Sequence, residues 1–408
     1  MIILYRKDRI SEPRRGPVMT DTAELPFNDQ QTAASAIKKG NTKEYTTGIL
    51  PSQAIRGLIA TGEITAQNPI PELQIQPASI DLRLGVMAYR VRGSFLPGPH
   101  STVRKRLADF TMHEIDVTDG AVLEKGCVYV VPLQENLNLS KDISGLANPK
   151  SSTGRLDIFT RVITNYAAEF DRIPPGYKGP LFAEISPLTF SVKIRAGTSL
   201  SQLRFRRGSP PPFEAAMRRL HERTPLITTK DAVKADITKT GVAFTVDLMG
   251  DPDTGIVGYK AKRHADVVDL EKISHYEVDD FWDPVYSRNS NSLILDVDNF
   301  YILASKEAVT IPPDHAAEMC PYDTYVGEFR VHYAGFFDPG FGLDNAGGHG
   351  SRAVLEVRSH DVPFVLEDSQ RVGRLVYQRL TAVPDQLYGQ EIGSNYQKQG
   401  LKLSKHFK

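Results

Sequence analysis

Short apolar runs of alternating polarity, separated by glycine and proline, recur along most of this chain. The clearest runs lie at 126–139, 181–188 and 190–206. A period of two is typical of strands that bury one face, and 31 glycines and 27 prolines supply turns between them. The sequence therefore predicts an all-β fold with a few short helices. One such helix is capped by Ser52 and carries Ile55, Leu58 and Ile59 on one face.

The second half of the chain repeats the first at a constant offset. Residues 172 positions apart match in type at Tyr129/Tyr301, Glu135/Glu307, Asp142/Asp314, Pro149/Pro321, Glu184/Glu356, Leu203/Leu375 and Phe205/Tyr377. One register over so many positions favours a tandem duplication over coincidence. The offset breaks upstream, because the first half carries extra residues around 93–112. There we take a helical pattern at 266–273, followed by Asp279 and Asp280, as the recurrence of the first helix.

These patterns divide the chain into four parts. Residues 1–47 are polar and aperiodic, which predicts a disordered arm. Residues 48–207 form the first domain, and 208–264 hold the connection and the start of the second copy. Residues 265–408 form the second domain and end in a polar tail.

Composition narrows the class of protein. The 408 residues balance 49 Lys and Arg against 49 Asp and Glu, which argues against nucleic-acid binding through a basic field. Two distant cysteines, Cys127 and Cys320, give no disulfide framework. The sequence has neither a long apolar span nor a signal-peptide pattern, so we expect a cytoplasmic protein without a membrane partner.

Two kinds of residue can carry chemistry. The segment Lys150–Arg155 combines two cations, three hydroxyls and a glycine, a set that can bind a polyphosphate and that also suits a polar surface turn. Glu184 and Glu356 each follow a tight turn and lie inside an apolar strand. Burial there can raise a carboxyl pKa into the range of a proton-transfer group; alternatively, each Glu faces solvent on an edge strand.

Metal-binding and nucleotide-loop motifs are absent from the sequence. It contains no H-x-E with a later C-x-x-C, which is the zinc deaminase arrangement, and no H-E-x-x-H, P-loop or G-x-G-x-x-G. We expect His332, His360 and Trp282 to be structural. The polar tail after Tyr388 can either cover a ligand or fray.

Four segments together resemble the dCTP deaminase family, which shares its fold with trimeric dUTPases. They are Gln76–Gly85 (QPASIDLRLG), Lys150–Arg155 (KSSTGR), Pro175–Gly179 before Glu184, and Gln202–Phe205; the tail Asn395–Gly400 with Ser404 and Lys405 is also similar. The resemblance covers 48–207 and 265–408 and is to a long, two-copy form. It implies dUTPase-like domains of the β-clip or distorted β-barrel type, duplicated in tandem.

The resemblance also implies roles for individual residues. Lys150, Ser151, Ser152 and Arg155 correspond to the phosphate loop, of which Ser151 and Arg155 also reach the reacting base. Asp338 corresponds to the residue that holds the deoxyribose 3′-hydroxyl, where the first copy has Pro174. Glu356, or alternatively Glu184, corresponds to the catalytic carboxylate. Val354, Tyr388 and Gln399 complete the expected substrate contacts, and Asn395 replaces a family lysine.

In the second copy the phosphate loop, Tyr322–Gly327, has lost both cations and gained Asp323. The intact loop and the intact sugar contact therefore belong to different copies, so we expect a composite site with Glu356 as the proton shuttle. A ring built like the trimers of the family would instead pair the loop with Glu184. Arg155 is expected to matter more for binding than Lys405.

The resemblance implies hydrolysis of dCTP to dUTP and ammonia, with Mg²⁺ as the counter-ion of the triphosphate and no zinc. We expect a homo-oligomer, with dUTP and dTTP as product or feedback ligands. Two alternatives stay open: a dUTPase or a bifunctional enzyme that forms dUMP, and a non-catalytic, regulatory dNTP-binding protein.

Overall fold

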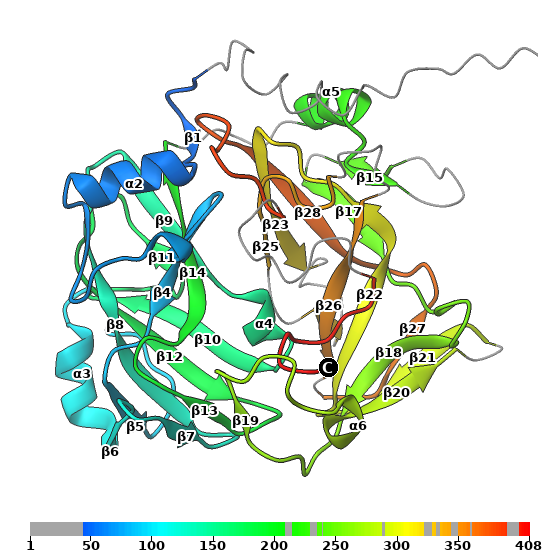
Figure 1. The fold of residues 1–408 in the computed structure, drawn as a ribbon, viewed down its shortest axis with the longest axis horizontal. Coiled ribbons are helices and arrows are strands. Elements are labelled where there is room, and N and C mark those ends of the chain that lie inside the picture. Colours follow the sequence, from blue (N-terminus) through cyan, green and yellow to red (C-terminus); the bar gives the residue numbers. More distant parts are fainter. Residues whose placement is uncertain are drawn as a thin grey trace, which may run out of the picture. The chain divides into compact units, whose positions relative to one another are not determined.

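The first half of the chain folds into antiparallel sheets, seen in a computed structural model (Figure 1). The model describes residues 44–208, 214–228, 235–238, 240–287, 290–321, 329–331, 335–343, 350–359, 361–389 and 400–408. Most of the predicted arm at 1–47 lies outside these residues. The first strand of the described residues is β1 (Gly48–Ile49), followed by α2 (Ser52–Ala60).

Two six-stranded sheets and part of a smaller one form the first copy. One sheet has the order β11-β9-β14-β4-β3 with β1 on β14, and the other has β10-β12-β8-β5-β6 with β2 on β8. The elements are β2 (Ile64–Ala66), β3 (Ile75–Gln76), β4 (Ser79–Arg83), β5 (Met87–Val91), α3 (Val103–Phe110), β6 (Thr111–Asp116), β7 (Ala121–Leu123), β8 (Val128–Asn138), β9 (Ile143–Pro149), α4 (Ser151–Gly154), β10 (Ile158–Thr164), β11 (Arg172–Ile173), β12 (Lys178–Pro187), β13 (Val192–Ile194) and β14 (Ser199–Arg207).

The second half repeats this topology. Its sheets have the orders β25-β23-β28-β17-β16 and β24-β26-β22-β18-β20, with β15 on β22. The elements are α5 (Glu214–Arg223), β15 (Ile227–Thr228), β16 (Ile237–Thr238), β17 (Gly241–Thr245), β18 (Ile256–Ala261), β19 (Val268–Asp269), α6 (Val278–Phe281), β20 (Trp282–Tyr286), β21 (Ser292–Leu295), β22 (Phe300–Val309), β23 (His315–Pro321), β24 (Phe329–Val331), β25 (Phe336–Phe337), β26 (Ser351–Ser359), β27 (Phe364–Glu367) and β28 (Arg371–Arg379).

Side-chain contacts repeat along with the topology. The hydroxyl of Tyr129 accepts the backbone N–H of Glu124, and the hydroxyl of Tyr301 accepts that of Asp296. Buried Glu135 accepts the backbone N–H of Arg83, as Glu307 accepts that of Thr245. The prediction of a mainly β fold, duplicated in tandem, is confirmed.

Some local predictions are wrong. The segment 266–273 is not a helix: it contains β19, which pairs in parallel with β13 of the first copy. The counterpart of α2 is α5, and the strands after it lie in the range 208–264. Ser52 does not cap α2, because Pro51 holds that position and the Ser52 hydroxyl donates to Asp385 instead.

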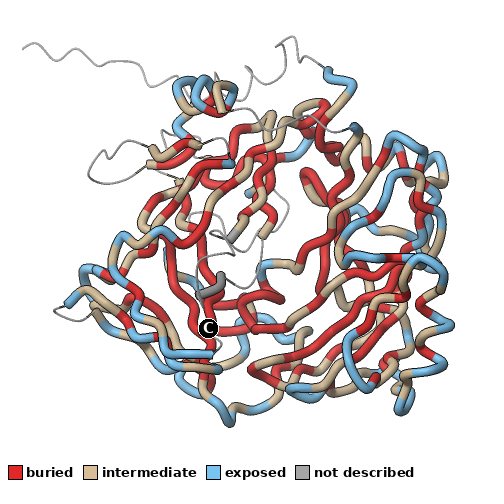
Figure 2. The backbone as a smooth tube through the Cα atoms, turned by 180° about the vertical axis from the view of Figure 1, so that it is seen from behind, coloured by how far each residue is buried: buried red, intermediate tan, exposed pale blue. Residues whose placement is uncertain are grey.

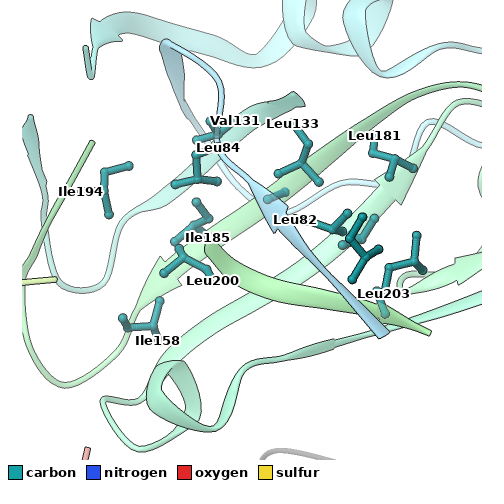
Figure 3. Close-up of a cluster of buried hydrophobic side chains, with 14 of the residues drawn as sticks. Leu82, Leu84, Val131, Leu133, Ile158, Leu181, Ile185, Ile194, Leu200 and Leu203 are labelled. Atoms are coloured by element: carbon teal, nitrogen blue, oxygen red, sulfur yellow. The ribbon is translucent and has the colours of Figure 1, made fainter. Parts of the chain in front are cut away.

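Each copy has its own apolar core, and the first core extends into the second copy. Figure 3 shows leucine, isoleucine and valine side chains from β4, β8, β12 and β14 packed together in the first copy. Phe300, Ile302 and Val354 of the second copy join this cluster. The rings of Phe190 and Trp282 meet across the two copies at 5.5 Å, which gives Trp282 the packing role expected of it. Figure 2 shows buried backbone continuing through both halves.

Two further observations bear on the class of protein. No helix in the part of the chain that the structure describes combines the length and apolar character needed to span a membrane. Cys127 and Cys320 are both free thiols, in agreement with the absence of a disulfide framework.

Candidate active site

The segment Lys150–Arg155 forms a tight turn at the end of β9. Ser151–Gly154 make the single turn α4, and Arg155 follows as its C-cap. The carbonyl of Leu200 on β14 holds this turn in place, because it accepts the Lys150 backbone N–H and the Thr153 hydroxyl, both at 2.9 Å. These two hydrogen bonds keep the polar groups of the turn at a fixed place on the sheet that contains β14.

The predicted phosphate-loop residues differ in exposure and partners. Ser151 is exposed, whereas Ser152 and Arg155 are buried. The Lys150 ammonium forms an ion pair with the carboxylate of Asp81 on β4. A cavity of about 350 Å³ opens beside the loop, and Lys150, Ser152, Lys405 and His406 are among its lining residues. Burial and the charge of Lys150 lower the pKa of Lys405, so two cations lie close together here.

The C-terminal segment 400–408 packs against this loop (Figure 1). Arg155 donates Nη1–H to the carbonyl of Lys402 at 2.8 Å, and the Ser404 hydroxyl donates to the carbonyl of Ser152 at 2.9 Å. The loop of the first copy is thus held by the end of the second.

Strand β26 carries Glu356 and presents two different faces. Ala353, Leu355 and Val357 point into the core of the second copy. Because side chains alternate along a strand, Val354 and Glu356 share the opposite face. Val354 belongs to the cluster of the first copy, so this face of β26 is turned toward the first copy.

Glu356 is buried on the face of β26 that is turned toward the first copy. Burial raises the pKa of its carboxyl to about 7, because a charge loses its hydration there. The charge of Arg155 acts in the opposite direction and lowers this pKa, while Asp157 raises it. A carboxyl with such a pKa can both accept and donate a proton near neutral pH.

Glu184 has the equivalent position in the first copy but different surroundings. It is buried on β12, and Arg161 donates to its Oε1 at 2.5 Å. Its face of the sheet carries Phe182, which packs with Phe95, Val103 and Leu107. These last residues belong to the extra segment around 93–112, including α3. The segment thus covers in the first copy the face that β26 turns toward its neighbour.

Asp338 lies in the turn after β25 and is buried. Arg204 of the first copy donates to its Oδ1 at 3.0 Å. Burial raises the pKa of Asp338, Arg204 lowers it, and the nearby charge of Asp81 raises it again. Because Asp81 pairs with Lys150, the structure brings the predicted sugar contact and the phosphate loop together.

Tyr388 lies against the same turn. Its backbone N–H donates to the carbonyl of Pro339 at 2.8 Å, and its ring lies 5.6 Å from that of Phe341. The turn needs Gly340, whose φ is 95° and where a Cβ atom would lie 2.9 Å from the Cβ of Leu387.

Several sequence predictions lie outside the described residues. They concern Gln399, Asn395, His332, His360 and the second-copy loop 322–327. Within the described ranges, no three His, Cys, Asp or Glu side chains converge as metal ligands.

Four charged residues of this region were not singled out from the sequence: Asp81, Asp157, Arg204 and Arg358. Asp81 and Arg204 lie in segments that carry the resemblance, at Gln76–Gly85 and Gln202–Phe205, and those segments point to them. Asp157 and Arg358 lie in no motif. Their ion pair joins residues 201 positions apart, which sequence spacing does not reveal.

Known proteins are similar to this chain over nearly its whole length. Residues 46–209 match the family model for the N-terminal domain of 2′-deoxycytidine 5′-triphosphate deaminase, and 213–407 match that for the C-terminal domain. The crystal structure of 2′-deoxycytidine 5′-triphosphate deaminase from Agrobacterium tumefaciens superposes with a TM-score of 0.79 at 56% identity. It covers 82% of this chain and 100% of its own.

Curated relatives match a shorter part of the chain. A dCTP deaminase of Halorubrum lacusprofundi is 30% identical over 38% of this chain and 76% of its own length. A protein of Streptomyces avermitilis named "dCTP deaminase, dUMP-forming" is 32% identical over 40% of this chain and 83% of its own. With both domain models matched, the chain belongs to the 2′-deoxycytidine 5′-triphosphate deaminase family of hydrolytic enzymes.

Proposed function

We propose that this protein hydrolyses dCTP to dUTP and ammonia, with Glu356 as the proton shuttle. The observation that carries the proposal is the place of Glu356, which is buried on the face of β26 turned toward the first copy, where the charge of Arg155 acts on its carboxyl. A carboxyl with a pKa of about 7 is half ionised near neutral pH, so one group can take a proton from water and later return it.

The chemistry assigns one role to each group. As a carboxylate, Glu356 accepts a proton from the water whose oxygen attacks C4 of cytosine and passes this proton to N3, which gives a tetrahedral intermediate with a hydroxyl and an amino group on C4. Glu356 then accepts the hydroxyl proton and delivers it to the amino group, so the C–N bond breaks, ammonia departs and C4 becomes a carbonyl. One such shuttle contributes roughly 10²–10⁴ in rate, and positioning of base and water supplies much of the rest.

Substrate contacts follow from the charges around Glu356. Lys150, Arg155 and Lys405 supply the cations for the triphosphate, and Asp338 is suited to accept a hydrogen bond from the 3′-hydroxyl. Mg²⁺ arrives as the counter-ion of the triphosphate and is part of the substrate. Tyr388, beside the turn of Asp338, and Gln399 in the tail are the expected covering residues.

One assay tests the function. Purified protein is incubated with dCTP and Mg²⁺, ammonia is measured, and dCTP, dUTP and dUMP are separated. Equal amounts of ammonia and dUTP support the proposal. Formation of dUMP would identify a bifunctional enzyme, as in the name of the Streptomyces relative. Tight dCTP binding without ammonia would identify a regulatory protein.

A further inference from the structure

A buried ion pair crosses between the two copies two residues away from Glu356. Arg358 donates to the carboxylate of Asp157 through both Nε (3.1 Å) and Nη2, and Nη2 also contacts the Thr189 hydroxyl at 2.7 Å. Its Nη1 donates to the carbonyl of Asp298 at 2.9 Å. Arg358 is 8% exposed and Asp157 is fully buried, so little solvent screens the pair.

The pair is coupled to the candidate site by its spacing. On the strand, Glu356 and Arg358 share one face of β26. On the loop side, Asp157 follows Arg155 by two residues. On β26 the acid Glu356 precedes the base Arg358, and on the loop the base Arg155 precedes the acid Asp157. A shift of β26 along the loop would break the Arg358–Asp157 pair and change the distance between Glu356 and Arg155.

Two observations separate this pair from ordinary packing. In the first copy, Ser186 occupies the position of Arg358, so the pair exists only beside Glu356. Asp157 also has a φ of 57°, which is strained for a residue other than glycine and persists only where surrounding contacts hold it.

We infer that the Arg358–Asp157 pair is a positioning device that holds Glu356 in register with Arg155. This inference rests on the proposed role of Glu356. Arg358 and Asp157 act through Glu356 and need not touch the substrate.

The charges that face Glu356 make the inference testable. On the loop these are Arg155 and Asp157, and on β26 it is Arg358. The neighbouring face of β22 presents Phe300 and Ile302. The C-terminal segment against the loop brings Lys402 and Lys405. Asp157 raises the pKa of Glu356. Arg358 carries the opposite charge, so we expect its removal to shift this pKa in the direction opposite to the removal of Asp157.

The experiment measures the pH dependence of kcat for dCTP deamination in the full chain. In this profile the acid limb is the range in which kcat falls as the pH is lowered. Asp157→Asn should move the acid limb to lower pH, and Arg358→Gln should move it to higher pH, each by about half a unit or more. Both should lower kcat about tenfold or more with little change in KM, because misplacing a catalytic group costs rate. Arg358→Lys keeps the charge and should restore the position of the limb and part of kcat.

Arg352→Gln is the matched control. Arg352 is also on β26 and pairs with an aspartate, Asp247, but within the second copy. It should change the denaturation midpoint without moving the acid limb. If both Asp157→Asn and Arg358→Gln fold and behave as this control does, the pair is only structural and the inference is wrong. If the wild type releases no ammonia, or Glu356→Gln stays active, the proposed function fails instead.

Discussion

Glu184 and Glu356 occupy the same register in the two copies: Glu184 lies opposite Val130 on β8, and Glu356 lies opposite Ile302 on β22. Their surroundings nevertheless differ. Glu184 is paired with Arg161 beneath the extra segment of the first copy, whereas Glu356 is turned toward the first copy, where the charge of Arg155 lowers its pKa. Duplication thus gave two equivalent carboxyls, and the insertion covers one of them.

The first prediction ranks these two carboxyls. Glu356→Gln should abolish ammonia release from dCTP, because an amide cannot shuttle the proton. Glu184→Gln should keep most of the activity and lose some stability, since Arg161 loses its charged partner. Ammonia release and the denaturation midpoint are measured for both variants. An inactive but folded Glu184→Gln beside an active Glu356→Gln would reverse the assignment.

The pKa of Glu356 predicts how activity and stability depend on pH. Because the carboxylate is the attacking form, kcat should fall as pH drops through about 7. For stability the sign is opposite: the folded pKa lies above the ordinary value of 4.5, so the native state binds more protons between these values and loses stability as pH rises.

Glu356→Gln removes this titration. It should match the wild type in stability near pH 4 and exceed it above pH 8, by up to roughly 3 kcal/mol. Urea unfolding at the two pH values measures the difference. An equal difference at both values would mean that the carboxyl ionises in the folded protein as it does in water.

Arg155 and Lys405 test the phosphate contacts. Arg155→Ala should weaken dCTP binding roughly ten- to hundredfold, because a charge-assisted hydrogen bond contributes about 1.5–3 kcal/mol. It should also move the acid limb of kcat to higher pH, since Arg155 lowers the pKa of Glu356. Lys405→Ala should weaken binding less and move that limb less than Arg155→Ala does. KM for dCTP and the pH profile of kcat distinguish the two variants. Equal effects of Arg155→Ala and Lys405→Ala would contradict the assignment of the phosphate loop.

Much of the fold could be predicted from local patterns. Period-two alternation located β8, β12 and β14, and the constant offset matched the two copies residue by residue. The beginning of the second copy was harder to find, because β15 and β16 have only two residues each and show no period. The pattern at 266–273 predicts a helix, but the pairing of β19 with β13 decides its structure.

The candidate site could be predicted as residues but not as an assembly. The family resemblance points to Lys150, Arg155, Asp338 and Glu356 and predicts that they meet across the copies. It could not tell which carboxyl is covered, because that depends on where the extra segment near 93–112 packs. Pairs such as Arg204–Asp338 join residues 134 positions apart, and no local pattern links them.

Chelation tests the expected independence from zinc. Deamination should survive treatment with a zinc chelator once Mg²⁺ is restored, because the proposed shuttle is a carboxylate and Mg²⁺ belongs to the triphosphate. The metal content of active protein is measured in parallel. Stoichiometric zinc, with activity lost on its removal and regained on its return, would contradict the proposed mechanism.

Asp338 predicts a preference for the 3′-hydroxyl of the sugar. The wild type should have a higher kcat/KM for dCTP than for 2′,3′-dideoxycytidine triphosphate, because only dCTP can donate a hydrogen bond to this carboxylate. A bond to a charged group is worth about 1.5–3 kcal/mol, so the ratio should be roughly ten- to hundredfold. Asp338→Ala should bring the ratio close to one. Asp338→Ala also leaves Arg204 without its carboxylate partner, which can lower the amount of folded protein. Both kcat/KM values are measured on one preparation, so this loss cancels in their ratio. An unchanged ratio would show that Asp338 does not contact the sugar.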